Sequence, residues 1–319
     1  MPSYTILFFI LLSLVFSCAH RDSNTIIVDQ SAESLSVGVT VDEEINEKIT
    51  IDEQSGIGPQ FEESSYQQQQ GKETIHAINF ADSGNLVVAY IGFLKASKKN
   101  NYSIVTGRGM GAIIAALYCA GKAPDHMEWF FYKLSGELKD KNISYLSDEW
   151  VALIKQSLVK EFGQATLQTY SKTCILPIFN SNKRSTEYRR KGQVVPILMA
   201  NIDLLQRKNP WRSPVIHPDQ LDSEMKNLGA DQLTMVRVPL DTINYRQWDG
   251  YIIGIYGKID AIQKMQSKNY DLVLELPLAQ VNLDDLSHLP QTIQQGFKST
   301  NSWMEEQVQK DERGTIDEE

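Results

Sequence analysis

A run of five residues has a spacing suited to covalent chemistry. It consists of Gly107, Arg108, Gly109, Met110 and Gly111, and so follows a Gly-x-x-x-Gly pattern. A short β-rich segment precedes the run, and a small, apolar segment typical of a tightly packed helix follows it. A strand, a sharp turn and a buried helix form the frame of a nucleophile elbow, in which the middle residue carries an attacking hydroxyl. Here the middle residue is Gly109, so the pattern predicts the geometry of a nucleophilic site without its nucleophile.

Glycine at the middle position also has a structural explanation. The nucleophile of an elbow stands in a strained backbone conformation that costs a residue other than glycine about 1–3 kcal/mol. Glycine adopts this conformation freely. A chain released from catalysis would therefore gain stability from Gly109.

The segments around this run predict a parallel α/β sheet. Residues 74–81 are typical of a buried strand, 82–85 of a turn and 86–97 of a helix, and a strand at 103–106 leads into the run. The order strand, helix, strand, helix implies a right-handed crossover and a parallel sheet. Further strands are predicted at 173–179, 232–238 and 272–276, and further helices at 124–134, 148–162, 194–205, 221–228, 252–265 and 290–307.

The first 18 residues have the features of an export signal. Residues 6–16 form a nearly continuous apolar run that is too short to span a bilayer comfortably. The run ends at Ser17 and Cys18, which resemble a bacterial lipobox, where the cysteine is acylated and becomes the mature N-terminus. We therefore expect lipidation of Cys18. The alternative is a plain signal peptide with an incidental cysteine.

The chain after the signal divides into three parts. Residues 19–71 are acidic and glutamine-rich, and we expect a disordered tether because they bury too little apolar surface to offset their ordering entropy. Residues 72–308 are expected to fold, and residues 309–319 form a polar tail. The net charge of −9 argues against nucleic acid as a partner.

Other residues with chemical potential form weaker patterns. The five histidines lack the spacing of metal ligands, so we expect no metal, and no motif indicates a cofactor. Cys119 and Cys174 are expected to be two free core thiols, with a disulfide between them as the alternative. The aromatic run 129–132 fits core packing or an acyl-binding wall. The basic run 188–191 fits a solvated turn or a site for phospholipid headgroups.

Several segments together resemble the bacterial patatin-like phospholipases. They are residues 88–96, the run around Gly109 and residues 117–124, and residues 228–231 are similar to a later landmark of this family. The resemblance is good over residues 75–127 and patchy as far as 238. It implies an α/β fold with three α/β/α layers around a central, mostly parallel sheet. It also implies a lipid acyl hydrolase in which a Ser-Asp dyad attacks an ester and a glycine-rich loop stabilises the oxyanion.

The resemblance places the dyad on residues that cannot perform its chemistry. Gly109 stands at the position of the nucleophilic serine. Ser213, followed by Pro214, stands at the position of the dyad aspartate. The chain's single Asp-Gly pair, Asp249-Gly250, lies on the wrong side of the later landmark and is interpreted as a loop turn.

The oxyanion loop implied by the resemblance is also degenerate. It falls on residues 82–87, where Asp82, Ser83 and Gly84 stand for three glycines. Leu86 replaces the arginine of the family's pattern. Of these features only Gly84 is retained, so the loop is expected to stabilise an oxyanion poorly.

These losses favour a pseudoenzyme over a hydrolase. Removing the nucleophile of a catalytic triad alone costs about 10⁶ in kcat. We expect a catalytically inactive lipoprotein of the bacterial cell envelope, anchored through Cys18 on the periplasmic face of the outer membrane, that binds lipid or an envelope protein. The alternative is a lipid acyl hydrolase that uses a displaced nucleophile.

Overall fold

The structure is a computed structural model that describes residues 74–180, 182–202, 220–240, 250–278 and 286–314. The expected export signal, the tether, Cys18 and Ser213 lie outside these residues.

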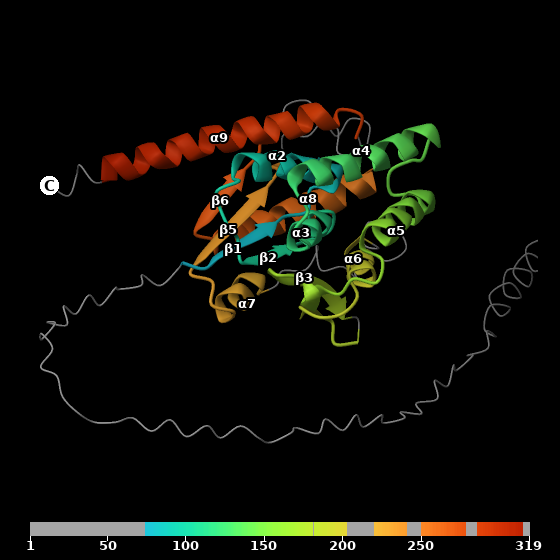
Figure 1. Cartoon of the computed structure of the whole chain (residues 1–319), viewed down its shortest axis with the longest axis horizontal. Helices are drawn as coiled ribbons and strands as arrows, with labels where there is room; N and C mark the ends of the chain where they lie inside the picture. Colours follow the sequence, from blue (N-terminus) through green and yellow to red (C-terminus); the bar gives the residue numbers. More distant parts are fainter. Residues whose placement is uncertain (1–73, 181, 203–219, 241–249, 279–285, 315–319) are drawn as a thin grey trace, which may run out of the picture. The chain divides into compact units, whose positions relative to one another are not determined.

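Six strands form one sheet at the centre of the described residues (Figure 1). They are β1 (His76–Phe80), β2 (Ile104–Gly107), β3 (Thr173–Asn180), β4 (Ser185–Arg189), β5 (Gln232–Arg237) and β6 (Leu272–Glu275). Their order is β4-β3-β2-β1-β5-β6, and every neighbouring pair is parallel except the antiparallel pair of β3 and β4. The mostly parallel α/β sheet expected from the sequence is confirmed.

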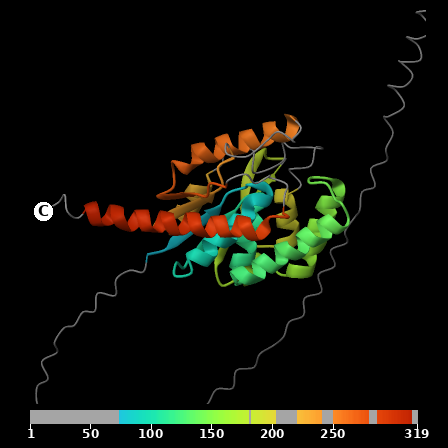
Figure 2. The same cartoon turned by 90° about the horizontal axis from the view of Figure 1, so that it is seen from above.

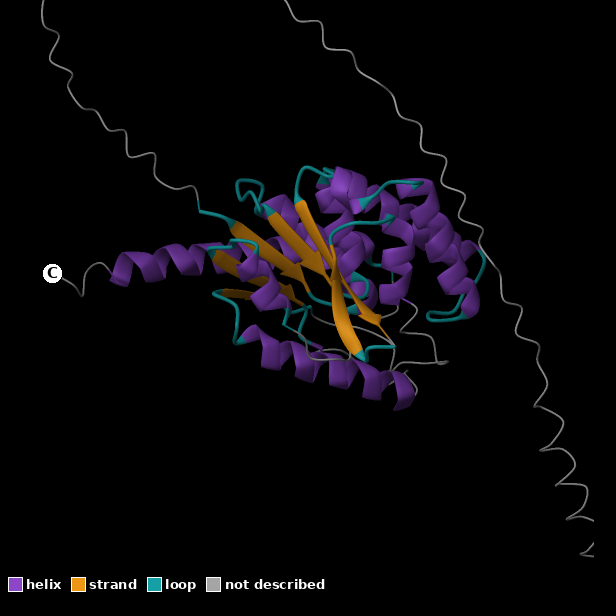
Figure 3. Cartoon of the chain, turned by 90° about the horizontal axis from the view of Figure 1, so that it is seen from below, coloured by secondary structure: helices purple, strands orange, loops and turns teal. Residues whose placement is uncertain are grey.

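Helices cover both faces of this sheet. Figure 2 shows α8 (Gly250–Ser267) and α9 (Leu289–Gly314) on opposite sides of the strands, and Figure 3 shows the strands between helices. The remaining helices among the described residues are α2 (Ala89–Ala96), α3 (Gly111–Cys119), α4 (Pro124–Asp140), α5 (Asp148–Phe162), α6 (Val194–Ile202) and α7 (Leu221–Asn227). The layers are therefore helix, sheet and helix, as expected.

Alternate residues of the central strands fill two separate cores. Ile78 and Phe80 of β1 belong to the larger core, which α2, α3 and α9 share. Ala77 of β1 belongs to the smaller core, against Leu221 and Met225 of α7. Because side chains alternate across a strand, a strand buried on both faces has a continuous apolar sequence, and this is why the central strands were predictable.

Helices α2 and α9 touch through their backbones at two glycines. A Cβ on Gly92 would lie 2.5 Å from the backbone nitrogen of Phe297 and closer still to the carbonyl oxygen of Ile293. A Cβ on Gly296 would lie 2.9 Å from the carbonyl carbon of Ala89. The two glycines therefore set how closely the last helix packs on the first.

The predicted elements differ from the structure in several places. The helix expected at 124–134 continues to Asp140 as α4. The helix expected at 86–97 begins as a 3-10 helical turn, η2 (Gly84–Val88), before α2. Half of the basic run 188–191 lies in β4, which was not predicted, because β4 is a short, partly exposed edge strand. Helix α9 continues to Gly314, through the first residues of the expected polar tail, since residues 309–313 contain neither glycine nor proline. No helix among the described residues has the length and apolar character needed to cross a membrane.

Candidate functional site

The turn between β2 and α3 has the geometry of an elbow. The strand ends at Gly107, the helix begins at Gly111, and Gly109 between them has a φ of +52°. A Cβ on Gly111 would lie 2.5 Å from the carbonyl oxygen of Ala81, so the helix starts directly against the end of β1. Positive φ at the middle residue and close approach at its flanks are the conditions that glycine meets and other residues do not.

The side chain of Asp82 lies directly over Gly109. Asp82 follows β1 and is completely buried. A Cβ on Gly109 would lie 2.5 Å from Oδ2 and 2.6 Å from Oδ1 of this carboxyl group. The carboxyl group of Asp82 therefore occupies the space in which the side chain of an elbow nucleophile would stand.

Two backbone amides of the site bind this carboxyl group. Met110, the residue after the elbow's middle position, donates its N–H to Oδ1 of Asp82 at 3.1 Å. Gly84 donates its N–H to the same oxygen at 3.2 Å. In an acyl hydrolase of this geometry, the residue after the nucleophile and a second loop supply the oxyanion donors. Oδ1 of Asp82 thus sits where the donors of an oxyanion hole converge.

Burial makes this carboxyl group hard to ionise. Desolvation raises the pKa of Asp82 from its ordinary value of 3.8 to about 6, although the N–H groups of Met110, Gly84 and Ser83 oppose the shift. Oδ2 has no hydrogen-bond partner among the described residues. The backbone carbonyl of Asp82 accepts a hydrogen bond from Nε2 of Gln263 in α8 at 2.6 Å, which holds the loop in place.

The one hydroxyl of the adjacent loop is already engaged. Ser83 is buried, and its Oγ lies 2.8 Å from the hydroxyl oxygen of Tyr90. Tyr90 donates its own proton to the carbonyl oxygen of Ala81 at 3.0 Å, so Ser83 is the donor to Tyr90. Desolvation raises the pKa of Tyr90, which keeps its phenol neutral and unable to act as a base. Ser83 therefore lacks the activation that a displaced nucleophile needs.

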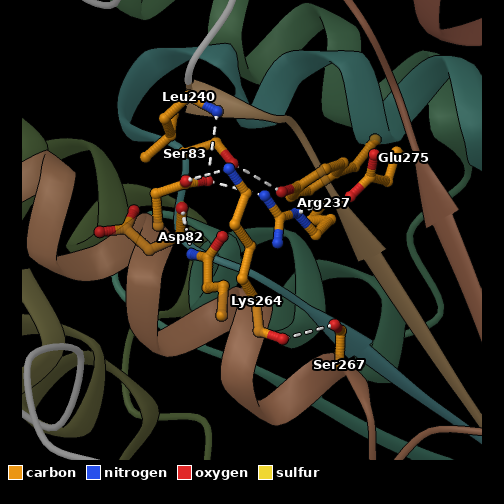
Figure 4. A network of polar contacts seen from close by, with 10 residues as sticks. Asp82, Ser83, Arg237, Leu240, Lys264, Ser267 and Glu275 are labelled. Carbon is orange, nitrogen blue, oxygen red and sulfur yellow. Dashed lines mark hydrogen bonds and ion pairs between the residues drawn. The ribbon is translucent and has the colours of Figure 1, made fainter.

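An ion-pair network around the buried Arg237 lies beside Asp82 and Ser83 (Figure 4). Arg237, at the end of β5, is fully buried and donates from Nη2 to Oδ1 of Asp260 in α8 at 2.7 Å. Lys264 lies 2.9 Å from Oδ2 of Asp260, and Glu275 lies 3.4 Å from Nε of Arg237. A buried arginine is tolerated only when paired in this way, so the network fixes α8 against β5 and β6.

These groups meet at the carboxyl ends of β1 and β5. Phe80 pairs with Gly107 on one side and with Val236 on the other, so the strand ends are level. Strand β2 lies on one side of β1 and β5 lies on the other, so the strand order reverses direction at β1. In open α/β sheets, ligands bind at the carboxyl ends of the strands beside such a topological switch point. Segments 203–219, 241–249 and 279–285 lie outside the described residues.

The remaining predicted site residues are placed as follows. Leu86 is fully buried in η2, and Arg108 is 3% exposed with its N–H bonded to the carbonyl of Phe80 at 3.1 Å. Ser213, expected at the dyad position, lies outside the described residues. Sequence reasoning missed Arg237 and Asp260. The signal in the sequence is the charged Arg237 at the end of a strand that alternates between polar and apolar residues.

The aromatic run on α4 is split between core and surface. Phe130 and Phe131 are buried, whereas Trp129 and Tyr132 are 53% and 58% exposed and stack with ring centroids 5.6 Å apart. Trp129 and Phe130 line a groove of about 250 Å³ between α4 and α5. Core packing thus explains half of the run, and the groove keeps the acyl-binding wall as a hypothesis.

A second cavity lies between η2, α4 and the start of α5. Its volume is about 260 Å³, and it is lined by Asn85 of η2, Trp150 of α5, and residues of α4 and of the segment before α9. Tyr145 in its wall lies 2.7 Å, hydroxyl to hydroxyl, from Tyr256 of α8. No group of three or more histidine, cysteine or acidic side chains suited to a metal occurs among the described residues.

No protein family model matches the chain, and no curated protein sequence matches it.

Proposed function

We propose that this chain is a membrane-anchored, patatin-like pseudoenzyme that acts by binding lipid or an envelope protein rather than by hydrolysing esters. The observation that carries the proposal is the position of the carboxyl group of Asp82. It fills the space above Gly109, and it accepts hydrogen bonds from both amides that would stabilise an oxyanion. At this turn of the described residues, an ester carbonyl would find no nucleophile at position 109, and the amides of Met110 and Gly84 already donate to Asp82.

The energetic consequence favours inactivity. Loss of the nucleophile alone costs about 10⁶ in kcat, and the residual rate of such variants comes from the oxyanion hole. Each oxyanion donor contributes about 3–4 kcal/mol of transition-state stabilisation. Since Met110 and Gly84 already donate to Asp82, that residual contribution is also lost.

The membrane part of the proposal rests on Cys18. Acylation there would place the chain at the periplasmic face of the bacterial outer membrane, and three acyl chains hold a protein far more firmly than one. A tether formed by residues 19–71 would let the folded part range about 40 Å from the anchor. The cavities beside α4 would then lie within reach of lipid or of an envelope protein.

Hydrolysis assays test the catalytic part of the proposal. The full chain is incubated with p-nitrophenyl esters and phospholipid vesicles, beside the variants Ser83→Ala and Thr106→Val. These variants remove two fully buried hydroxyls, one on the loop after β1 and one on β2 just before Gly107. We expect turnover equal to buffer in all three samples. Turnover in the parent that either variant abolishes would establish the alternative, a lipid acyl hydrolase with a displaced nucleophile.

A further inference from the structure

One face of helix α4 exposes two aromatic side chains beside a lysine. The rings of Trp129 and Tyr132 stack, with an angle of 10° between their planes, and both side chains are more than half exposed. Nζ of Lys133 lies 5.0 Å from the centroid of the Trp129 ring. The three residues are spaced i, i+3 and i+4 in α4, so they share one side of the helix. We call them the aromatic face of α4.

The core of the protein does not use this face. The buried residues of α4 include Met127, Phe131 and Leu134, and α4 packs on α2, which also contacts α9 (Figure 1). Among the side chains that the structure describes, Trp129 and Tyr132 are the only aromatic ones with more than half of their surface exposed. Adjacent exposed rings forgo the free energy of burial, and such patches mark binding surfaces.

The acidic side chains that flank the aromatic face are already paired with lysines. The pairs are Asp125 and Glu128 with Lys95, and Glu137 with Lys141 and Lys160. Lys133 has no acidic partner among the described residues, and its ammonium group lies beside the Trp129 ring instead. At the end of the helix, Lys139 and Asp140 add one charge of each sign. The aromatic face therefore offers an ammonium group to an anionic group of a partner.

The groove beside the aromatic face carries charges of both signs. It has a volume of about 250 Å³ and is lined by Trp129, Phe130, Lys133, Glu137, His126, Ser157, Lys160 and Glu161. Two lysines and two carboxylates suit a ligand that has one phosphate and one ammonium group, as a zwitterionic phospholipid headgroup does. The net charge of −9 of the whole chain opposes an anionic bilayer, so the charges favour a zwitterionic one.

We propose that the aromatic face of α4 docks on the surface of a zwitterionic phospholipid bilayer. The proposal rests on the membrane anchor that the proposed function includes, and it names the surface that meets the membrane. Tryptophan and tyrosine are enriched where membrane meets water, because each has an apolar ring and a polar N–H or O–H that stays hydrated. Lysine lies along apolar surface and keeps its ammonium group in the polar layer, where the phosphates are. Trp129, Tyr132 and Lys133 supply these three roles on one helix face.

Vesicle binding tests the proposal without the anchor. Residues 19–319, which include every described residue, are sedimented with vesicles of phosphatidylethanolamine and phosphatidylcholine. We expect the double variant Trp129→Ala/Tyr132→Ala to bind at least about tenfold more weakly than the parent. Lys133→Gln should bind about two- to tenfold more weakly, through loss of the contact with phosphate. Replacing half of the lipid by phosphatidylglycerol should weaken binding of the parent.

Met265→Ala is the matched control. Met265 is 51% exposed but lies on α8, on the opposite side of the strands from α9, so its variant should bind as the parent does. Melting temperatures of all variants should equal that of the parent, because the changed side chains lie on the surface.

Fluorescence tests whether α4 itself touches the membrane. The vesicles are prepared with brominated acyl chains, which quench a tryptophan only at close range. We expect quenching in the bound parent, its loss in Trp129→Phe, and its retention in Trp303→Phe, which changes a partly buried tryptophan of α9.

Three results overturn the inference. They are equal vesicle binding by the parent and the double variant, binding only to vesicles with phosphatidylglycerol, and tryptophan quenching that persists in Trp129→Phe. Self-association of the parent that the double variant abolishes, without vesicle binding, overturns it in favour of a second copy of the chain. None of these measurements needs acylation of Cys18 or ester hydrolysis, so failure of the docking face and failure of the proposed function are distinguishable.

Discussion

The carboxyl group of Asp82 and the α-carbon of Gly109 exclude any side chain between them. A Cβ on Gly109 would lie 2.5 Å from Oδ2 and 2.6 Å from Oδ1 of Asp82. The carboxyl group of Asp82 can therefore occupy this position only because residue 109 is a glycine.

A double-mutant cycle measures this relationship. Gly109→Ala should cost about 2–4 kcal/mol, because it adds a steric clash to the strain of a side chain at positive φ. In an Asp82→Ala background, the three clashing atoms are gone and the same change should cost only about 1–2 kcal/mol. Urea unfolding of the four proteins gives the coupling energy.

Gly121 provides the matched control. It has a φ of +73°, but nothing lies within 4 Å of the position of its Cβ. Gly121→Ala should therefore cost the strain alone and show no coupling to Asp82→Ala. Equal costs for Gly109→Ala in both backgrounds would mean that the carboxyl group is elsewhere in solution.

The pKa of Asp82 predicts a pH-dependent stability. Its pKa is raised from 3.8 to about 6 in the folded chain, so the folded state binds this proton more tightly than the unfolded state. The associated stability is complete below pH 3.8 and is lost as the pH rises through about 6. A shift of about two units corresponds to roughly 3 kcal/mol.

Asp82→Asn isolates this contribution because the amide oxygen keeps both backbone hydrogen bonds and cannot ionise. The free energy of unfolding of the parent, relative to that of Asp82→Asn, should fall by roughly 3 kcal/mol between about pH 4 and pH 7. Parallel pH profiles for the two proteins would contradict the burial of an ionisable carboxyl group at this position.

The contact between α2 and α9 predicts a second stability effect. Gly92→Ala and Gly296→Ala should each cost about 1–3 kcal/mol or more, because each new methyl group meets backbone atoms that cannot move aside. Gly136→Ala in α4 is the control, since its methyl group would meet nothing within 4 Å and should stabilise the helix by about 0.5–1 kcal/mol. Thermal unfolding of the three variants decides whether α9 packs as described.

The frame of the site could be predicted from the sequence because glycines determine it. Gly107 and Gly111 are four positions apart around a middle residue at positive φ, and their spacing together with the segments on either side indicates a strand, a turn and a helix. The apolar strands on either side could be predicted for the same local reason. Edge strand β4 could not, because its residues are partly exposed and its pairing depends on β3.

The contents of the site could not be predicted. The family resemblance placed Asp82 in a degenerate oxyanion loop. The direction of its side chain depends on how that loop packs against α3, which the sequence does not show. The amides of Gly84 and Met110 still converge, and the acceptor they meet is the chain's own carboxyl group. The ion pair of Arg237 with Asp260 likewise joins strand β5 to helix α8. Nothing in the sequence between these two residues indicates that they meet.

The anchor makes a prediction that is independent of the folded part. Mass spectrometry of the mature N-terminus should find Cys18 as the first residue and acylated, because an apolar run ends directly before it. The protein should float with vesicles in a density gradient, and Cys18→Ala should not. An unmodified N-terminus at another residue would refute the anchor.

The last prediction concerns repair of the elbow. If only a nucleophile were missing, Gly109→Ser would restore ester hydrolysis, but we expect it to be inactive and less stable than the parent. Its side chain would meet the carboxyl group of Asp82, and the amides of Met110 and Gly84 would remain occupied. Removing that carboxyl group in Gly109→Ser/Asp82→Ala should relieve the clash and free both amides, while the strain of a side chain at positive φ remains.

Even this double variant should not turn over esters, because an unassisted serine hydroxyl stays protonated at neutral pH. The residue at the expected base position is Ser213, which cannot accept the proton. Adding Ser213→Asp and Pro214→Gly to the double variant supplies the base, and only this set should show p-nitrophenyl ester turnover above buffer. Melting temperatures and turnover are measured on all variants together. Hydrolysis by Gly109→Ser alone would mean that a working base and free oxyanion donors already exist, and the pseudoenzyme proposal would then fail.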